Sequence, residues 1–301
     1  MTFSNSLNQF LSFLESEKNL SGNTITAYQK DLLEFSDFLT ALKRDFTEVE
    51  PRDVRKWLMT LSRRGLKRTS IARKLSSLRT FYKFLVRSGT VSANPAEPVT
   101  FPLRSRPLPK GLTIKEMEVL LDSQPREDFI GIRDQAMLEL LYSTGIRVSE
   151  LTGLDLDDVS LEPEIIKVRG KGGKERIVPF GQHAKTALER YLKVRYDLLS
   201  KLKRQDEQAL FLKSRGGRLT PRSVQRIVNQ YGWRLTLSGN LTPHMFRHSM
   251  ATHLLEMGAD LRSIQKLLGH SSVSTTQIYT NLDVSRLKTV FSQCHPRARK
   301  K

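Results

Sequence analysis

The sequence predicts a mainly α-helical protein with a small β-sheet, divided into an N-terminal all-α bundle and a C-terminal α+β domain. Apolar residues recur at helical spacing through most of the 301 residues. One stretch, residues 164–180, instead has two short runs rich in β-branched residues around a glycine-rich turn. A proline-rich segment separates the two halves. These three observations define the predicted fold class.

Residues 1–95 are expected to form a bundle of four helices. Ser21 and Ser70 are suited to cap the second and fourth helices, and Pro51 fits the first turn of the third. Apolar side chains every three to four positions predict the core face of each helix. These residues are Leu7, Phe10, Leu11, Leu14, Ile25, Tyr28, Leu32, Phe35, Leu39, Val54, Trp57, Leu58, Leu61, Ile71, Leu75, Leu78, Phe81, Tyr82 and Leu85.

The charge of the chain points to a polyanion as partner. Fifty Lys and Arg against 31 Asp and Glu give a net charge of +19. Between Val54 and Ala96 there are eleven basic residues and no acidic one, whereas a solvated face normally mixes signs. A merely basic surface is the alternative to a DNA-binding one. The residues that we expect to bind DNA are Arg63, Arg64, Lys67, Arg68, Arg73, Lys74, Arg79 and Lys83.

The proline-rich segment predicts a stiff, basic linker between two domains. We place the N-terminal helical domain at residues 1–95, the linker at 96–110 and the second domain at 111–301.

The second domain is expected to open with a short helix after Thr113 and a stronger one that ends at Thr144-Gly145. Residues 164–180 follow as a β-hairpin with Lys171 at its tip. We then expect a long helix, an edge strand at Ala209–Leu212, and helices from Pro221 to about Phe291.

Two kinds of site are disfavoured by the residue spacing. Gly170 to Arg176 does not provide the phosphate loop of a nucleotide site. His244 and His248 have zinc-helix spacing, but they lack the intervening Glu and flank Arg247. The stretch 241–280 also has too few carboxylates for a two-metal site. We therefore expect no cofactor and no metal.

Without a metal to activate water, a side-chain nucleophile is the natural route to phosphate chemistry, and Tyr279 is the candidate. A phenol with a pKa near 10 needs a cationic setting. Arg147, Arg247, His244 and His270 are able to supply it. Each of these residues also has a structural alternative: an Arg paired with Glu150, a His at a turn, a packed Tyr. For His248 and His253, packing or hydrogen bonding is the expected role.

At this point the residues resemble the tyrosine recombinase (phage integrase) family, and within it the bacterial Xer type. The motifs are TGIRVSEL with Arg147, the hairpin Lys171, TPHMFRHSMATHLLEMGADL with His244 and Arg247, LLGHSS with His270, and STTQIYT with Tyr279. All six positions of the family's catalytic set are filled. The N-terminal part is similar to the SAM-like core-binding domain of the family.

The resemblance implies a DNA strand-exchange enzyme that requires neither metal nor ATP. Tyr279 would attack a phosphodiester, giving a 3′-phosphotyrosyl link and a free 5′-hydroxyl. Arg147 and Arg247 would hold the nonbridging oxygens. Lys171 would protonate the leaving oxygen, His244 would act in proton transfer, and His270 would hydrogen-bond the phosphoryl group.

The resemblance also implies a role in chromosome dimer resolution at cell division. Its partners would be a double-stranded DNA recombination site, a homologous Xer-type recombinase in a heterotetramer or homotetramer, and an activator from the division or DNA-translocation machinery. The segment after Tyr279 would dock on a neighbouring protomer or, alternatively, on its own domain. The competing functions are a phage- or mobile-element-type integrase, a type IB topoisomerase more distantly, and a non-catalytic DNA-binding protein.

The chain has no membrane-spanning run and its start lacks the pattern of a signal peptide, so we expect a cytoplasmic protein without a membrane partner. The single cysteine, Cys294, permits no internal disulfide, which fits a reducing compartment.

Overall fold

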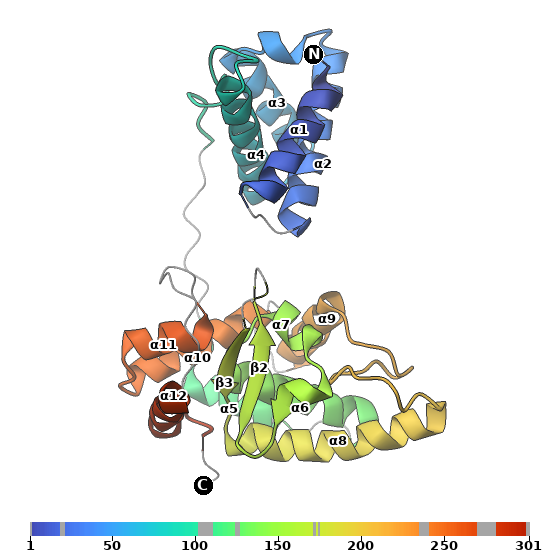
Figure 1. Cartoon of the computed structure of the whole chain (residues 1–301), viewed down its shortest axis with the longest axis vertical. Helices are drawn as coiled ribbons and strands as arrows, with labels where there is room; N and C mark the ends of the chain where they lie inside the picture. Colours follow the sequence, from blue (N-terminus) through green and yellow to red (C-terminus); the bar gives the residue numbers. More distant parts are fainter. Residues whose placement is uncertain are drawn as a thin grey trace. The chain divides into compact units, whose positions relative to one another are not determined.

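A computed structural model of the chain describes residues 2–18, 22–101, 111–123, 127–170, 173, 175–234, 241–269 and 281–298, apart from the side chains of residues 23 and 281–286 (Figure 1). The chain divides into two compact units, Met1–Arg106 and Pro107–Lys301. None of the described helices combines the length and hydropathy needed to cross a membrane. The predicted fold class, mainly α with a small sheet, is confirmed.

The described residues of the N-terminal unit form a helical bundle (Figure 1). Its elements are α1 (Phe3–Ser16), α2 (Gly22–Ala41), the 3-10 turn η1 (Phe46–Glu48), α3 (Pro51–Arg63) and α4 (Arg68–Arg87). Aromatic rings fill its centre: Trp57 is 1% exposed, and its ring centroid lies 4.9 Å from that of Phe35. The hydroxyl of Tyr82 donates to the carbonyl of Phe46 at 2.8 Å, so the polar end of a buried ring is satisfied.

Two features of this unit differ from the sequence prediction. Helix α4 begins at Arg68 with Lys67 at the N-cap, so Ser70 lies inside the first turn and does not cap it. Ala96 and Val99, which the sequence assigns to the linker, are buried in the bundle core. The guanidinium of Arg79 donates to the carbonyls of both residues and fastens this segment to α4.

The C-terminal unit is built around α6, which is almost entirely buried and packs against α8, α10 and β3 (Figure 1). Its helices are α5 (Ile114–Asp122), α6 (Phe129–Thr144), α7 (Val148–Gly153), the 3-10 turn η2 (Leu156–Asp158), α8 (Gln182–Leu202), α9 (Pro221–Arg234), α10 (Pro243–Glu256), α11 (Leu261–Leu268) and α12 (Asn281–Cys294). Its strands are β1 (Val159–Ser160), β2 (Ile165–Arg169) and β3 (Glu175–Pro179).

The strands form one antiparallel sheet in the order β1-β2-β3. The predicted hairpin is confirmed by the β2–β3 pairing, in which Val168 faces Arg176. Strand β1 was not predicted. Ala209–Leu212 is not a strand: its ends form only isolated bridges, to Asp155 and Arg218.

The segment after Tyr279 packs on its own unit over residues 287–298. Leu287, Phe291 and the free thiol of Cys294 are buried in that unit. Beyond the helix, the guanidinium of Arg297 donates to both carboxylate oxygens of buried Glu139. Residues 287–298 are thus held by contacts within their own unit.

Candidate active site

Arg147 lies at a turn between two helices of the C-terminal unit. Helix α6 ends at Gly145, whose φ of 59° is the left-handed conformation that favours glycine. A β-carbon there would lie only 3.0 Å from side-chain atoms of Leu268 and Met250. The turn makes Arg147 the N-cap of α7, where its backbone N–H donates to Glu150 Oε2 at 2.8 Å. Its guanidinium also donates to Glu150 Oε1 at 2.9 Å, so the ion pair considered from the sequence is present.

Arg247 reaches the same turn from α10. The apolar face of that helix buries Phe246, Met250 and Leu254, which brings the Arg247 side chain inside the unit. The guanidinium donates to the carbonyls of Gly145 at 2.7 Å and Leu268 at 2.6 Å. Both carbonyls lie at helix C-termini, where acceptors lack helical partners and the helix dipole favours a cation.

A third arginine joins this group, and the sequence analysis missed it. Arg176 on β3 is 8% exposed and binds Glu150 through two hydrogen bonds, at 2.8 and 2.9 Å. Its Nε donates to the carbonyl of Leu267 at 3.3 Å. The alternation of side chains along a strand could have identified Arg176, because it lies on the same buried face of β3 as Val178. We call Arg147, Glu150, Arg176 and Arg247 the arginine cluster.

The arginine cluster has an excess of positive charge at neutral pH. Burial raises the pKa of the Glu150 carboxyl, but the hydrogen bonds and charges of Arg176 and Arg147 outweigh it and the pKa is lowered. Burial, together with the charge of Arg147, lowers the pKa of Arg247 to about 10, which leaves it protonated. Three cations therefore face one carboxylate, an arrangement that favours an added anion such as a phosphodiester.

The histidines divide into exposed and buried ones. His244 is exposed in the first turn of α10, one turn before Arg247. His253 is buried, with its ring nitrogens 2.8 Å from the Tyr142 hydroxyl and from the carbonyl of Leu112, as expected for a structural histidine. His248 is exposed, so of the two expected roles, packing and hydrogen bonding, burial in the core does not apply to it.

Three residues of the predicted catalytic set, Lys171, His270 and Tyr279, lie outside the described residues. Their neighbours in the chain are described: β2 and β3 flank the hairpin tip, and α12 begins two residues after Tyr279. The structure thus brings Arg147 and Arg247 together and places His244 on the helix of Arg247.

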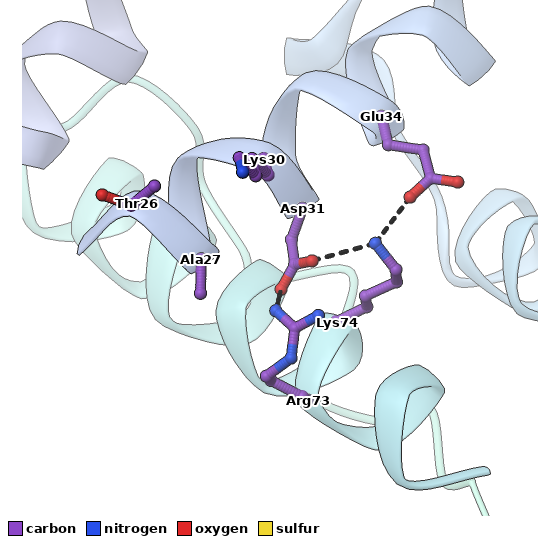
Figure 2. A pocket seen from close by; sticks show the side chains of 7 residues that line it. All are labelled: Thr26, Ala27, Lys30, Asp31, Glu34, Arg73 and Lys74. Atoms are coloured by element: carbon purple, nitrogen blue, oxygen red, sulfur yellow. Dashed lines mark hydrogen bonds and ion pairs between the residues drawn. The ribbon is translucent and has the colours of Figure 1, made fainter. Parts of the chain in front are cut away.

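Two of the predicted DNA-binding residues of α4, Arg73 and Lys74, lie beside two carboxylates of α2 (Figure 2). Asp31 is 1% exposed and accepts hydrogen bonds from Arg73, from Ser77 and, at 2.9 Å, from Lys74. The Lys74 ammonium lies between Asp31 and Glu34, and its side chain is 8% exposed. A buried ammonium needs such counterions, and Lys74 is accordingly removed from the predicted DNA-binding set.

The remaining members of that set fall into two groups. Arg79 serves the fold of its own unit through the carbonyls of Ala96 and Val99. The exposed residues of the set are Arg63, Arg64, Lys67, Arg68, Arg73 and Lys83. Arg64 also pairs with Glu34 at 2.7 Å, an exposed contact of the kind that contributes little to stability.

These features define a class of protein, and comparison with known sequences agrees with it. The profile of the phage integrase family matches residues 110–286, and that of the phage integrase N-terminal SAM-like domain matches residues 7–89. The chain belongs to the phage integrase family and is a tyrosine recombinase, an enzyme of site-specific DNA strand exchange.

Two of its relatives carry the name tyrosine recombinase XerC. The chain is 45% identical to a protein named tyrosine recombinase XerC from Thermodesulfovibrio yellowstonii, over 96% of each chain. It is 46% identical to another XerC, from Anoxybacillus flavithermus, over 97% of this chain and 98% of that one. The resemblance of the sequence motifs to the Xer-type tyrosine recombinases is confirmed, and the chain is most like the XerC proteins among them.

Solved structures share the fold. A crystal structure of XerA recombinase is 30% identical over 98% of this chain and 99% of that one, with a TM-score of 0.50. A XerH site-specific recombinase bound to a palindromic difH substrate is 23% identical over 95% of this chain and 84% of that one, with a TM-score of 0.70.

Proposed function

We propose that this recombinase cuts and rejoins DNA through Tyr279 and acts in the resolution of chromosome dimers at cell division. The observation that carries the proposal is the arginine cluster, in which Arg147 and Arg247 meet at the ends of three helices. Both arginines keep N–H donors that their described protein contacts do not occupy, since a guanidinium has five of them. The side chain of Arg147 is 47% exposed, which leaves an edge for a phosphate oxygen.

In the proposed reaction, the phenol oxygen of Tyr279 attacks the phosphorus and the bond from phosphorus to the 5′ oxygen breaks. Arg147 and Arg247 bind the nonbridging oxygens, where charge grows in the transition state. Lys171 gives a proton to the leaving oxygen, His244 moves the proton of the phenol, and His270 donates a hydrogen bond to the phosphoryl group. One phosphoester replaces another, so another 5′-hydroxyl can reverse the step without ATP.

We assign a core-binding domain that comprises residues 1–95 together with the segment to Val99, which packs in its core, then a linker up to residue 110 and a catalytic domain at 111–301. The exposed basic residues of α3, α4 and the turn between them would bind the phosphate backbone of duplex DNA. As part of the same proposal, the protein is cytoplasmic and works in a heterotetramer or homotetramer with a homologous recombinase, together with an activator from the division or DNA-translocation machinery. A contact between the segment after Tyr279 and a neighbouring protomer is part of the proposal; within residues 287–298 it would use side chains other than the buried Leu287, Phe291 and Cys294.

A nicked suicide substrate tests the proposal, because loss of a short fragment after cleavage prevents religation and traps the covalent adduct. Candidate chromosomal sites are presented with and without a homologous recombinase. We expect an adduct with the wild-type chain and none with Tyr279→Phe, which should still bind DNA. An integrase would form the adduct only on mobile-element sites, and a non-catalytic DNA-binding protein would form none on any site.

A further inference from the structure

Arg176 lies where three elements of the C-terminal unit meet. It projects from β3, its bidentate contact with Glu150 reaches the first turn of α7, and its Nε reaches the last turn of α11. Its guanidinium also lies against the left-handed cap of α11, since a β-carbon at Gly269 would come within 3.0 Å of its Nε. Arg176 is thus packed in one orientation, as its 8% exposure indicates.

The charge of Arg176 decides how tightly Glu150 holds Arg147. Glu150 is almost fully buried, with a side chain 3% exposed, and it shares its two oxygens between the guanidinium groups of Arg176 and Arg147. Without Arg176, Arg147 would be the guanidinium of the described cluster that still hydrogen-bonds Glu150. Because a charge pair is stronger away from water, Arg147 would then be drawn to the carboxylate and compete less well for a phosphate oxygen.

Arg176 also helps to fix the end of α11. The last carbonyls of that helix, at Leu267 and Leu268, accept hydrogen bonds from Arg176 and Arg247 respectively. Such carbonyls have no partner within their own helix. One side chain therefore ties the helix that precedes His270 in the chain to the turn that carries Arg147.

We propose that Arg176 is a positioning residue for DNA cleavage: by neutralising Glu150 it keeps Arg147 oriented by that carboxylate yet free to bind the scissile phosphate. The inference rests on the proposed function, in which Arg147 binds that phosphate. Arg176 itself does not touch the DNA.

The test measures the first-order rate of adduct formation at saturating suicide substrate, the Kd for uncleaved DNA and the Tm, for R176Q, R176K, E150Q and the double variant R176Q/E150Q. The matched control is R169Q, the same change on the neighbouring strand, at an exposed arginine paired with Glu175 and Asp158. We expect R176Q to slow cleavage by about 10- to 100-fold, less than the loss of a donor to the reacting phosphate, with little change in Kd. R176K, which keeps the charge, should recover part of the rate, and R169Q should match the wild type.

The decisive variant is R176Q/E150Q. Glutamine at position 150 still accepts the backbone N–H of Arg147 but no longer attracts its guanidinium, so the double variant should cleave several-fold faster than R176Q. A merely structural role for Arg176 predicts no such recovery, and a double variant no faster than R176Q would overturn the inference. If R176Q fails to fold, R176M and R176M/E150Q, which also remove the charge at position 176, carry the same comparison.

The proposed function and this inference fail separately. A wild-type chain that forms no adduct dependent on Tyr279 overturns the proposed function and the inference with it. A normal wild-type adduct together with an R176Q rate within about twofold of the wild type overturns the inference alone.

Discussion

Removing the Arg297 side chain should destabilise the C-terminal unit strongly, although the sequence places it in a basic tail. Its guanidinium binds buried Glu139 through two hydrogen bonds, one at 3.0 Å, and Asp122 at 2.9 Å. Glu139 is 2% exposed, so in Arg297→Met it loses its counterion without gaining water. Breaking a buried pair in this way costs about 3–5 kcal/mol of unfolding free energy.

The pH dependence sharpens this prediction. Burial raises the pKa of Glu139 to about 7 despite the opposing charge of Arg297. A folded pKa above the unfolded value means that the stability contribution is present below about pH 4.5 and is lost as pH rises through about 7. Arg297→Met removes the charge that lowers this pKa, so its penalty should be larger at pH 8 than at pH 6. The glutamine in Glu139→Gln is neutral at both pH values. The contribution of position 139 to the unfolding free energy should therefore not differ between pH 6 and pH 8, either in Glu139→Gln alone or in its combination with Arg297→Met.

Urea unfolding of the full chain at both pH values, followed by circular dichroism, measures these free energies. Hydrogen exchange of peptides from α6 and α4 assigns the loss to one unit. The control is Arg190→Met, whose partner Glu127 has a side chain 87% exposed, and it should cost no more than about 0.5 kcal/mol. An Arg297→Met penalty below about 1 kcal/mol, equal at the two pH values, would refute the reasoning.

Further predictions concern the N-terminal unit and the buried residue His295. Lys74→Met should destabilise the N-terminal unit, because Asp31 stays buried with one counterion fewer. Lys83→Ala should leave the free energy of unfolding unchanged and reduce the salt dependence of DNA binding by about one phosphate contact. Urea unfolding and salt titrations of DNA binding compare the two variants, and equal effects on DNA binding would contradict the distinction. Burial lowers the pKa of His295 to about 3, so the unfolded chain binds a proton that the folded chain excludes, and stability falls as pH drops below about 6.5. His295→Phe should flatten that part of the stability profile measured in urea, and an unchanged slope would count against it.

The sequence predicted what depends on local periodicity. The apolar stripes of α2, α3 and α4 and the alternation in β2 and β3 follow from spacing alone, and the family motifs identified the reaction class. Strand β1 was missed because two residues carry no period.

Pairing of charges over long stretches of chain was not predictable. Lys74 belongs to a basic run in sequence, yet its counterions are Asp31 and Glu34, about forty residues earlier in α2. Arg297 likewise stands in a basic tail, while Glu139 belongs to α6. The neighbouring sequence indicates that such a residue is a solvated cation, and only the fold shows that it is buried and paired with a carboxylate.

Arg176 shows the same limit within the candidate site. The sequence marked Arg147 and Arg247 through family motifs, but Arg176 stood in a hairpin whose charges were expected at its tip. Its partner Glu150 follows Arg147 by one helical turn, and the two segments meet only where the Arg176 side chain reaches from β3 to α7 and α11. The arginine cluster is therefore a product of tertiary structure.

The most direct measurement is the chemical identity of the trapped DNA adduct. Wild-type protein is incubated with the nicked substrate in EDTA, digested with a protease, and the DNA-linked peptide is sequenced by mass spectrometry. We predict a peptide containing Tyr279, joined through its phenol oxygen to a 3′-phosphate, with a free 5′-hydroxyl on the released fragment. A link to another residue, a 5′-phosphate linkage, or a requirement for divalent metal would contradict cleavage by Tyr279 at the arginine cluster.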